Sequence, residues 1–203
     1  MPTRDLLTGS DRAHADWLRA RWLLARLADT VGLPAPSSPA SRFGDCLWAR
    51  HLQASCGVSL EANLYGRSLS AAAPPHRFLP GVKGGLYSWD QTRLYPEEIL
   101  VEGLFDYAAL WQAGFHNVTC SMGTNLNARQ FRQLCDGPRT VYLAFDADRN
   151  GSGQQAAQSL VCRLAEQGVN VRTVVLPDDH DPNSFFVQGG DARQFQSLLE
   201  AAQ

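Results

Sequence analysis

TVYLAFDADRNG, residues 140–151, joins six residues typical of a buried β-strand to an acidic cluster that begins at Asp146. A second junction of this kind lies upstream, where the apolar run 99–101 leads into Glu102 and Asp106. If both runs are parallel strands, their acids emerge together at the carboxyl edge of one sheet. Open α/β folds bind their ligands at that edge. The sequence therefore predicts an α/β fold with a ligand site built from these acids.

A third acidic segment follows the β-branched run 170–176 and carries Asp178 and Asp181. Carboxylates that converge at one edge repel one another unless a cation or shared protons hold them together. Oxygen-only ligands suit Mg²⁺ or Mn²⁺. We expect no zinc, because the five cysteines form no CxxC pair and have no histidine nearby at zinc-ligand spacing.

Strand and helix patterns alternate from residue 97 to the C-terminus. We expect a further strand at 117–120 and helices at 105–113, 127–134, 154–166 and 191–202, the last capped by Asp191. This alternation predicts right-handed crossovers and a mainly parallel sheet flanked by helices.

The N-terminal half has a different pattern. An amphipathic helix is expected at 11–31, two strands at 46–52 and 60–67, and an irregular segment of basic and aromatic residues from 71 onward. Residues 1–96 carry a net charge of +4 and residues 97–203 a net charge of −6. We interpret this as a small helix-plus-hairpin α+β subdomain (1–96) before a catalytic domain (97–203). The asymmetry fits a nucleic-acid groove beside a metal site, and ordinary surface charge explains it about as well.

Other interpretations of the acids fit the sequence less well. An EF-hand loop beginning at Asp146 is excluded, because its twelfth position is Ala157 and a strand precedes it. A phosphatase that attacks through Asp146 needs a downstream lysine, and Lys83 lies upstream. Taken alone, Asp106 would be a helix cap and Asp181 a turn former.

Four spaced motifs in the C-terminal half occur in the order found in the Toprim domain of bacterial DnaG-type primases. They are VEGLFD (101–106), SMGT (121–124), FDADRNG (145–151) and LPDDHDP (176–182). Upstream, LYGR (64–67) and HRFL (76–79) followed by Lys83 resemble the glycine-arginine strand and the basic-aromatic segment of that family. The chain thus resembles a primase catalytic core lacking the family's zinc-binding and helicase-binding domains.

The resemblance implies roles for particular residues. Glu102 is the implied general acid/base and metal-site organiser, and Asp146 and Asp148 complete the catalytic set. Asp146, Asp148 and Asp178 would hold Mg²⁺ or Mn²⁺, with Asp106 and Asp181 as supporting acids. The residues implied to contact nucleic acid or nucleotide are Arg67, Arg77 and Lys83.

The implied activity is nucleotidyl transfer by two-metal chemistry, which makes short RNA primers on single-stranded DNA from ribonucleoside triphosphates. The context would be a mobile element or a larger replication assembly, with a replicative helicase or other replication subunits as partners. Alternatives are a Toprim metal-dependent nuclease and a non-catalytic nucleic-acid-binding accessory subunit; a topoisomerase is disfavoured. The N-terminus has no signal-peptide core and no 18-residue apolar run occurs, so we expect a cytoplasmic protein without membrane contact.

Overall fold

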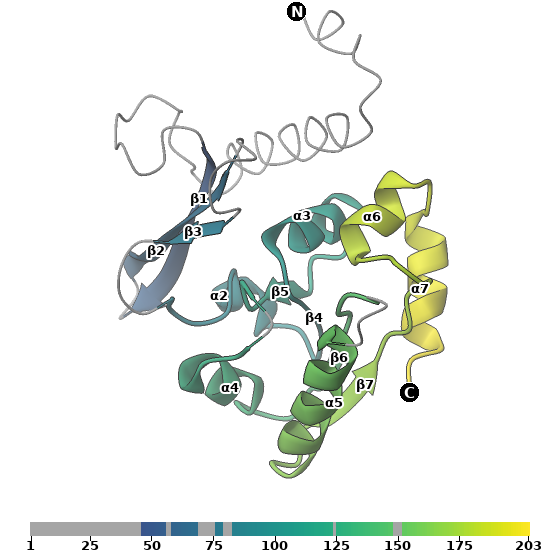
Figure 1. Ribbon diagram of the computed structural model, residues 1–203. Helices are drawn as coiled ribbons and strands as arrows, with labels where there is room; N and C mark the ends of the chain where they lie inside the picture. The colour runs from purple at the N-terminus through teal and green to yellow at the C-terminus, as the bar shows by residue number, and fades with distance from the viewer. Residues whose placement is uncertain (1–45, 56–57, 69–75, 79–82, 124, 148–151) are drawn as a thin grey trace, which may run out of the picture.

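The computed structural model describes residues 46–55, 58–68, 76–78, 83–123, 125–147 and 152–203 (Figure 1). The helix expected at 11–31 and Asp148, which the sequence predicts to be catalytic, lie outside these ranges. Within them, no helix is both long and apolar enough to cross a lipid bilayer. The division into domains at residues 96 and 97 stays a prediction.

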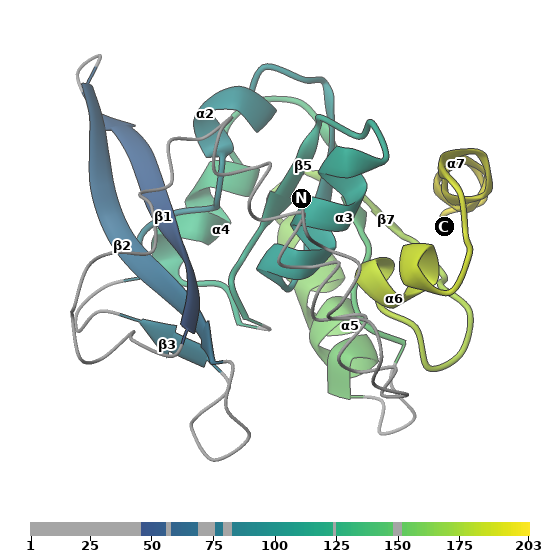
Figure 2. The ribbon, with the colours of Figure 1, turned by 90° about the horizontal axis from the view of Figure 1, so that it is seen from above.

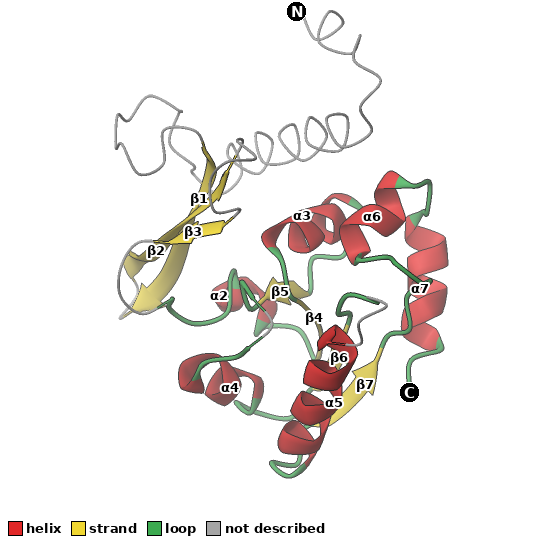
Figure 3. Ribbon diagram, viewed as in Figure 1, coloured by secondary structure: helices red, strands yellow, loops and turns green. Residues whose placement is uncertain are grey.

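Two sheets organise the described residues (Figure 3). The first is antiparallel, in the order β1-β2-β3, with strands Cys46–Ser55, Val58–Ser68 and His76–Phe78. The third strand was not expected, because three residues inside a basic-aromatic segment give too short a pattern to read as a strand.

The second sheet is parallel throughout, in the order β5-β4-β6-β7. Its strands are β4 Glu97–Val101, β5 Val118–Cys120, β6 Thr140–Leu143 and β7 Asn170–Thr173. The helices are α2 Trp89–Thr92, α3 Leu104–Gln112, α4 Ala128–Leu134, α5 Ser152–Ala165, α6 Pro182–Val187 and α7 Ala192–Glu200. The predicted α/β class, with a parallel sheet flanked by helices and a small antiparallel hairpin, is confirmed. The short helices α2 and α6 were not predicted.

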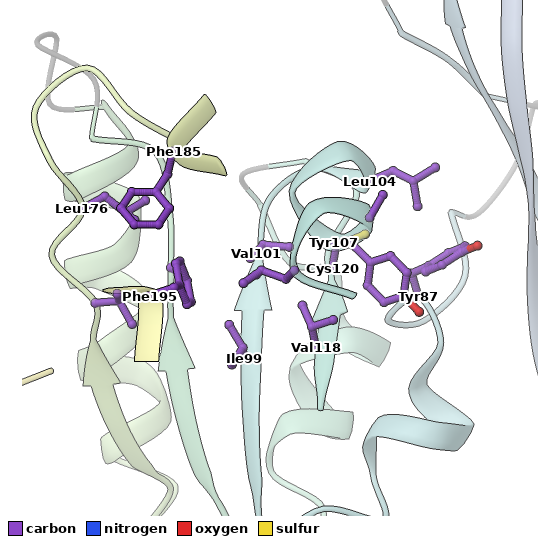
Figure 4. Packing of buried hydrophobic residues seen from close by; sticks show 14 of the residues in the cluster. Tyr87, Ile99, Val101, Leu104, Tyr107, Val118, Cys120, Leu176, Phe185 and Phe195 are labelled. Atoms are coloured by element: carbon purple, nitrogen blue, oxygen red, sulfur yellow. The ribbon is translucent and has the colours of Figure 1, made fainter. Parts of the chain in front are cut away.

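The central strand β4 shows why both faces of the parallel sheet are covered. Ile99 and Val101 point into a core that they share with α3, α6 and α7 (Figure 4). Leu100, between them, points into a second core with α4 and α5. Because side chains alternate along a strand, three successive apolar residues require a helical layer on each face.

The antiparallel sheet lies beside the β5 edge of the parallel sheet, away from α7, in both Figure 1 and Figure 2. Tyr65 of β2 is buried in the core that contains Val101 and Tyr107. The connecting segment runs along β5, where the Tyr87 amide donates to the carbonyl of Cys120 at 3.0 Å. Tyr87 also packs edge-on against Tyr107, with ring centroids 4.9 Å apart. The two sheets therefore share one hydrophobic core.

Candidate active site

The strand order places a topological switch point between β4 and β6. From β4 the chain crosses through α3 on one face to β5, whereas from β6 it crosses through α5 on the other face to β7. Connections that diverge in this way leave a crevice at the carboxyl ends of the two strands, where open α/β sheets bind ligands. Glu102 directly follows β4 and Asp146 lies three residues after β6. Both predicted acids therefore lie at the switch point.

The loop that carries Asp146 is joined to the loop that carries Asp178. The Ala147 amide donates to the carbonyl of His180 at 2.9 Å, and the Asp179 amide donates to the carbonyl of Ala147 at 3.1 Å. Asp178 itself is exposed at this edge. The backbone of Asp179 has a left-handed φ of 59°, which turns the chain toward α6. Backbone hydrogen bonds thus hold the second and third acidic segments against each other.

Asp106 is buried beneath these loops and connects two helix starts. Its Oδ2 accepts the Gly103 amide and its Oδ1 accepts the Asn183 amide, each at 3.1 Å. Burial raises the pKa of Asp106 well above its ordinary value; the charges of Asp181 and Asp146 raise it further, and the two amide bonds oppose the rise. Asp106 therefore holds the first turns of α3 and α6 together, with two other acids close enough to act on it.

Gly103 is required for this arrangement because a larger side chain would not fit, and not because of its backbone conformation. Its φ of −107° is open to any residue, but a Cβ atom there would lie 2.5 Å from Asp106 Oδ2. A glycine at this position lets another group come close to the backbone. The group that approaches the backbone in the structure is the Asp106 carboxylate.

Asp181 is the N-cap of α6, where its side chain accepts the Ser184 amide and Pro182 fills the first helical position. An N-cap carboxylate satisfies an amide that would otherwise lack a partner, and proline is suited to the next position. Asp106 and Asp181 thus position the acidic loops through the backbone of α6.

Lys83 belongs to the same edge although it comes from the basic half of the sequence. Its Nζ donates to the Met122 carbonyl at 3.1 Å and lies 4.9 Å from the centre of the Phe78 ring. Met122 belongs to the turn after β5, which has left-handed φ angles of 55° at Met122 and 134° at Gly123. The Gly123 amide donates to the Glu102 carbonyl at 2.9 Å. One turn therefore links the lysine to the strand end that carries Glu102.

Side-chain amides of Asn127, the N-cap of α4, and of Gln130 within α4 fix the backbone beside Lys83, a role that the sequence did not predict. Asn127 donates to the Gly84 carbonyl at 2.7 Å, and the buried Gln130 donates to the carbonyls of Gly85 and Ser121 at 3.2 and 2.8 Å. The sequence signal was the pair Asn127 and Gln130, which forms a capping box at the start of α4. That signal predicts the helix start but not its contact with the Lys83 segment.

The two arginines expected to contact nucleic acid lie on opposite faces of the antiparallel sheet. Arg67 is opposite His76 in the register and Arg77 is opposite Gly66. Since side chains alternate along a strand, Arg67 shares its face with Tyr65, which faces the common core, and Arg77 points the other way. The structure therefore brings Lys83 close to the Glu102 turn and separates Arg77 from Arg67.

The residues at this edge suit a divalent cation by chemistry, because Glu102, Asp146 and Asp178 offer only oxygen ligands. Among the described residues, no three histidine, cysteine or acidic side chains form a ready metal-binding group. Asp148, expected as a ligand, is not among the residues described. The metal site thus remains a prediction.

Known proteins resemble the chain over this region. Residues 99–186 match the family described as Toprim-like. The DNA primase of Aquifex aeolicus is 37% identical over 92 residues, which are 45% of this chain and 18% of that primase. The chain spans about a fifth of the length of the curated relatives it matches.

Solved structures agree with the sequence matches. A DNA primase domain from Pseudomonas aeruginosa superposes with a TM-score of 0.67 at 25% identity, covering 89% of this chain and 60% of that domain. A DnaG primase catalytic domain bound to single-stranded DNA superposes with a TM-score of 0.60 at 20% identity, covering 99% and 76%. The resemblance to the Toprim part of bacterial DNA primases is confirmed.

Proposed function

We propose that this Toprim-like chain, related to bacterial DNA primases, is the catalytic part of a primase. It would synthesise short RNA on single-stranded DNA from ribonucleoside triphosphates, within a replication assembly or a mobile element. The observation that carries the proposal is the position of Glu102 and Asp146 at the topological switch point, inside the region that matches known primases. Single-stranded DNA as the template is supported by the similar catalytic domain that was solved bound to it.

The implied cofactor is Mg²⁺ or Mn²⁺, and Asp146, Asp148, Asp178 and Glu102 are the residues that would hold it. When bound, such a cation stabilises negative charge on the oxygens of a phosphoryl group in transfer. Glu102 would act as the general acid/base, and its backbone is fixed by the Gly123 amide. The loops of Asp146 and Asp178 are held in place by their mutual hydrogen bonds and by α6, so little reorganisation is needed when substrate binds.

Lys83 would bind phosphate at the same edge. Its ammonium group is already oriented by the Met122 carbonyl and the Phe78 ring. A flexible side chain that is held in advance loses less conformational entropy when it binds an anion.

A priming assay tests the proposal. The protein is incubated with single-stranded DNA, labelled ribonucleotides and Mg²⁺ or Mn²⁺, and Asp146→Asn is compared with wild type. Asp136→Asn is the matched control, because this exposed aspartate precedes β6 at the opposite edge of the sheet. Extension products that are lost only in Asp146→Asn support a primase. Shortened DNA would indicate a nuclease instead, and binding without either product would indicate an accessory subunit.

A further inference from the structure

Four side chains form a cluster on the inner face of the antiparallel sheet: Tyr65 and Arg67 of β2, and His76 and Phe78 of β3. His76 is bonded at both ring nitrogens, with Nδ1 2.9 Å from the Tyr65 hydroxyl and Nε2 2.9 Å from Arg67 Nη1. Tyr65 is itself buried and packs edge-on against Phe78, with ring centroids 5.4 Å apart. The imidazole is therefore held between a fixed tyrosine and an arginine.

The partners of His76 determine its tautomer. A guanidinium group has only donors, so the contact with Arg67 requires Nε2 of His76 to be the acceptor. The proton of the neutral ring must then lie on Nδ1, which donates to the Tyr65 hydroxyl. A doubly protonated ring would have no acceptor for Arg67.

The surrounding charges also favour the neutral ring. Burial lowers the pKa of His76, and the positive charges of Arg67 and Lys83 lower it further. Arg67 contacts the imidazole from β2, and Lys83, from the segment after β3, lies over the adjacent Phe78 ring. The neighbouring Arg77 lies on the opposite face of the sheet. His76 is thus a neutral polar group beside two cations, one of which, Arg67, it contacts.

We infer that His76 is a positioning residue, whose neutral imidazole holds the Arg67 guanidinium so that the other N–H groups of Arg67 bind a phosphate. Among the described residues, only His76 accepts a hydrogen bond from Arg67, which leaves these donors for a ligand. The phosphate belongs to single-stranded DNA or to a ribonucleoside triphosphate. The inference rests on the proposed function, in which Arg67 contacts nucleic acid or nucleotide.

The first test is spectroscopic and independent of activity. In ¹⁵N-labelled protein at neutral pH, the imidazole shifts of His76 are expected to show the Nδ1–H tautomer. Arg67→Met is expected to raise the pKa of His76, because it removes one of the two positive charges that lower it. A ring protonated on Nε2 at neutral pH, or a pKa unaffected by Arg67→Met, would overturn the inference.

The second test measures binding of an oligothymidylate and, separately, of ATP. Arg67→Met and His76→Leu are each expected to weaken binding about 2- to 10-fold, the usual effect of losing one pre-oriented side chain. The double variant should bind no more weakly than Arg67→Met alone, because both changes remove the same contact. His76→Gln should restore binding, since its amide oxygen can accept from Arg67 and its amide nitrogen can donate to Tyr65. His116→Leu, an exposed histidine on a distant loop, is the control and should bind like wild type.

The ligand whose binding weakens identifies the source of the phosphate. Weaker binding of the oligothymidylate indicates contact with the template, and weaker binding of ATP indicates contact with a triphosphate. Additive effects of the two single changes, or no rescue by glutamine, would overturn the inference. Unchanged binding of both ligands by Arg67→Met would also overturn the inference. In that case the proposed function would still stand if Asp146→Asn abolishes priming. If priming is insensitive to Asp146→Asn but the coupling of His76 and Arg67 in binding is present, the proposed function fails and the positioning role holds.

Discussion

Two buried carboxylates, Glu98 and Asp106, lie at opposite edges of the parallel sheet and are stabilised differently. Glu98, at the amino end of β4, is fully buried and pairs with Arg139 at 3.1 Å, while the Arg139 guanidinium lies 4.8 Å from the centre of the Trp89 ring. Asp106, at the carboxyl edge, accepts two backbone amides, and the charged groups that shift its pKa, Asp181 and Asp146, are both acids. Burial raises the pKa of both carboxylates; Arg139 opposes the rise at Glu98, whereas the acids add to it at Asp106.

We interpret the difference as one between a charge that serves the fold and acids that are predicted to bind a cation. At the amino edge the chain supplies its own cation, so Glu98 is paired without a ligand. At the carboxyl edge acids are gathered around one another, which costs stability unless a cation binds. Carboxylates whose pKa values are raised by neighbouring acids are typical of functional sites. The comparison therefore predicts a role in stability for one end of β4 and a role in catalysis for the other.

Removing the Arg139 guanidinium at the amino edge should give the largest change in the free energy of unfolding. Arg139→Met leaves Glu98 buried without its partner, and breaking a buried pair in this way costs about 3–5 kcal/mol in the free energy of unfolding. Urea denaturation measures this cost. Arg132→Met, which removes an exposed arginine from α4, should change stability by less than about 1 kcal/mol. Similar values for the two variants would show that the Glu98 pair is not structural.

The second largest effect should be the contribution of Glu98 to the pH dependence of stability. The pKa of Glu98 is raised from 4.5 to about 7 in the folded protein, so the folded state binds this proton more tightly than the unfolded chain. Its contribution is therefore fully present below pH 4.5 and is lost as pH rises through about 7, a loss of up to about 3 kcal/mol. Glu98→Gln should flatten the stability profile across this window relative to wild type. Parallel profiles for the two proteins would exclude this assignment.

Supplying a cation at the carboxyl edge should stabilise the fold. A ligand present at 100 times its Kd adds about 2.7 kcal/mol to the free energy of unfolding. We expect Mg²⁺ to raise the melting temperature of wild type and of Asp136→Asn, but not of Asp146→Asn. Differential scanning calorimetry across a Mg²⁺ titration measures this. A rise of equal size in all three proteins would locate the ion elsewhere.

The sequence predicted the parts of this edge that depend on strands and motif order. Glu102 and Asp146 directly follow the apolar, β-forming runs 99–101 and 140–145, and the parallel arrangement of those strands then brings their ends together. The strand order that makes this edge a switch point was not predicted, because strand order depends on long-range pairing that no local pattern records.

The roles of Asp106, Glu98 and α6 were also beyond local patterns. Asp106 looked like an ordinary first-turn acid, and its contact with Asn183 joins residues 77 positions apart. Glu98 pairs with Arg139 across 41 positions, so the apolar run alone began the predicted strand at Ile99. The start of α6 was readable from Asp181 and Pro182, but its six residues are shorter than the helices that periodicity detects.

The smallest change in stability should come from substituting Gly103. This substitution tests whether Asp106 stabilises the carboxyl edge. In Gly103→Ala the new Cβ would meet Asp106 Oδ2 at 2.5 Å, so the carboxylate must move away from the Gly103 amide. The expected cost is about 1 kcal/mol, similar to the loss of a helix N-cap. The backbone at Gly103 is extended, with φ −107° and ψ 155°, so alanine causes no conformational strain there. In an Asp106→Ala background the same change should therefore cost almost nothing, because the atom it would meet is gone. A double-mutant cycle by urea denaturation measures this difference, and an equal cost in both backgrounds would mean that the glycine serves the backbone and not the carboxylate.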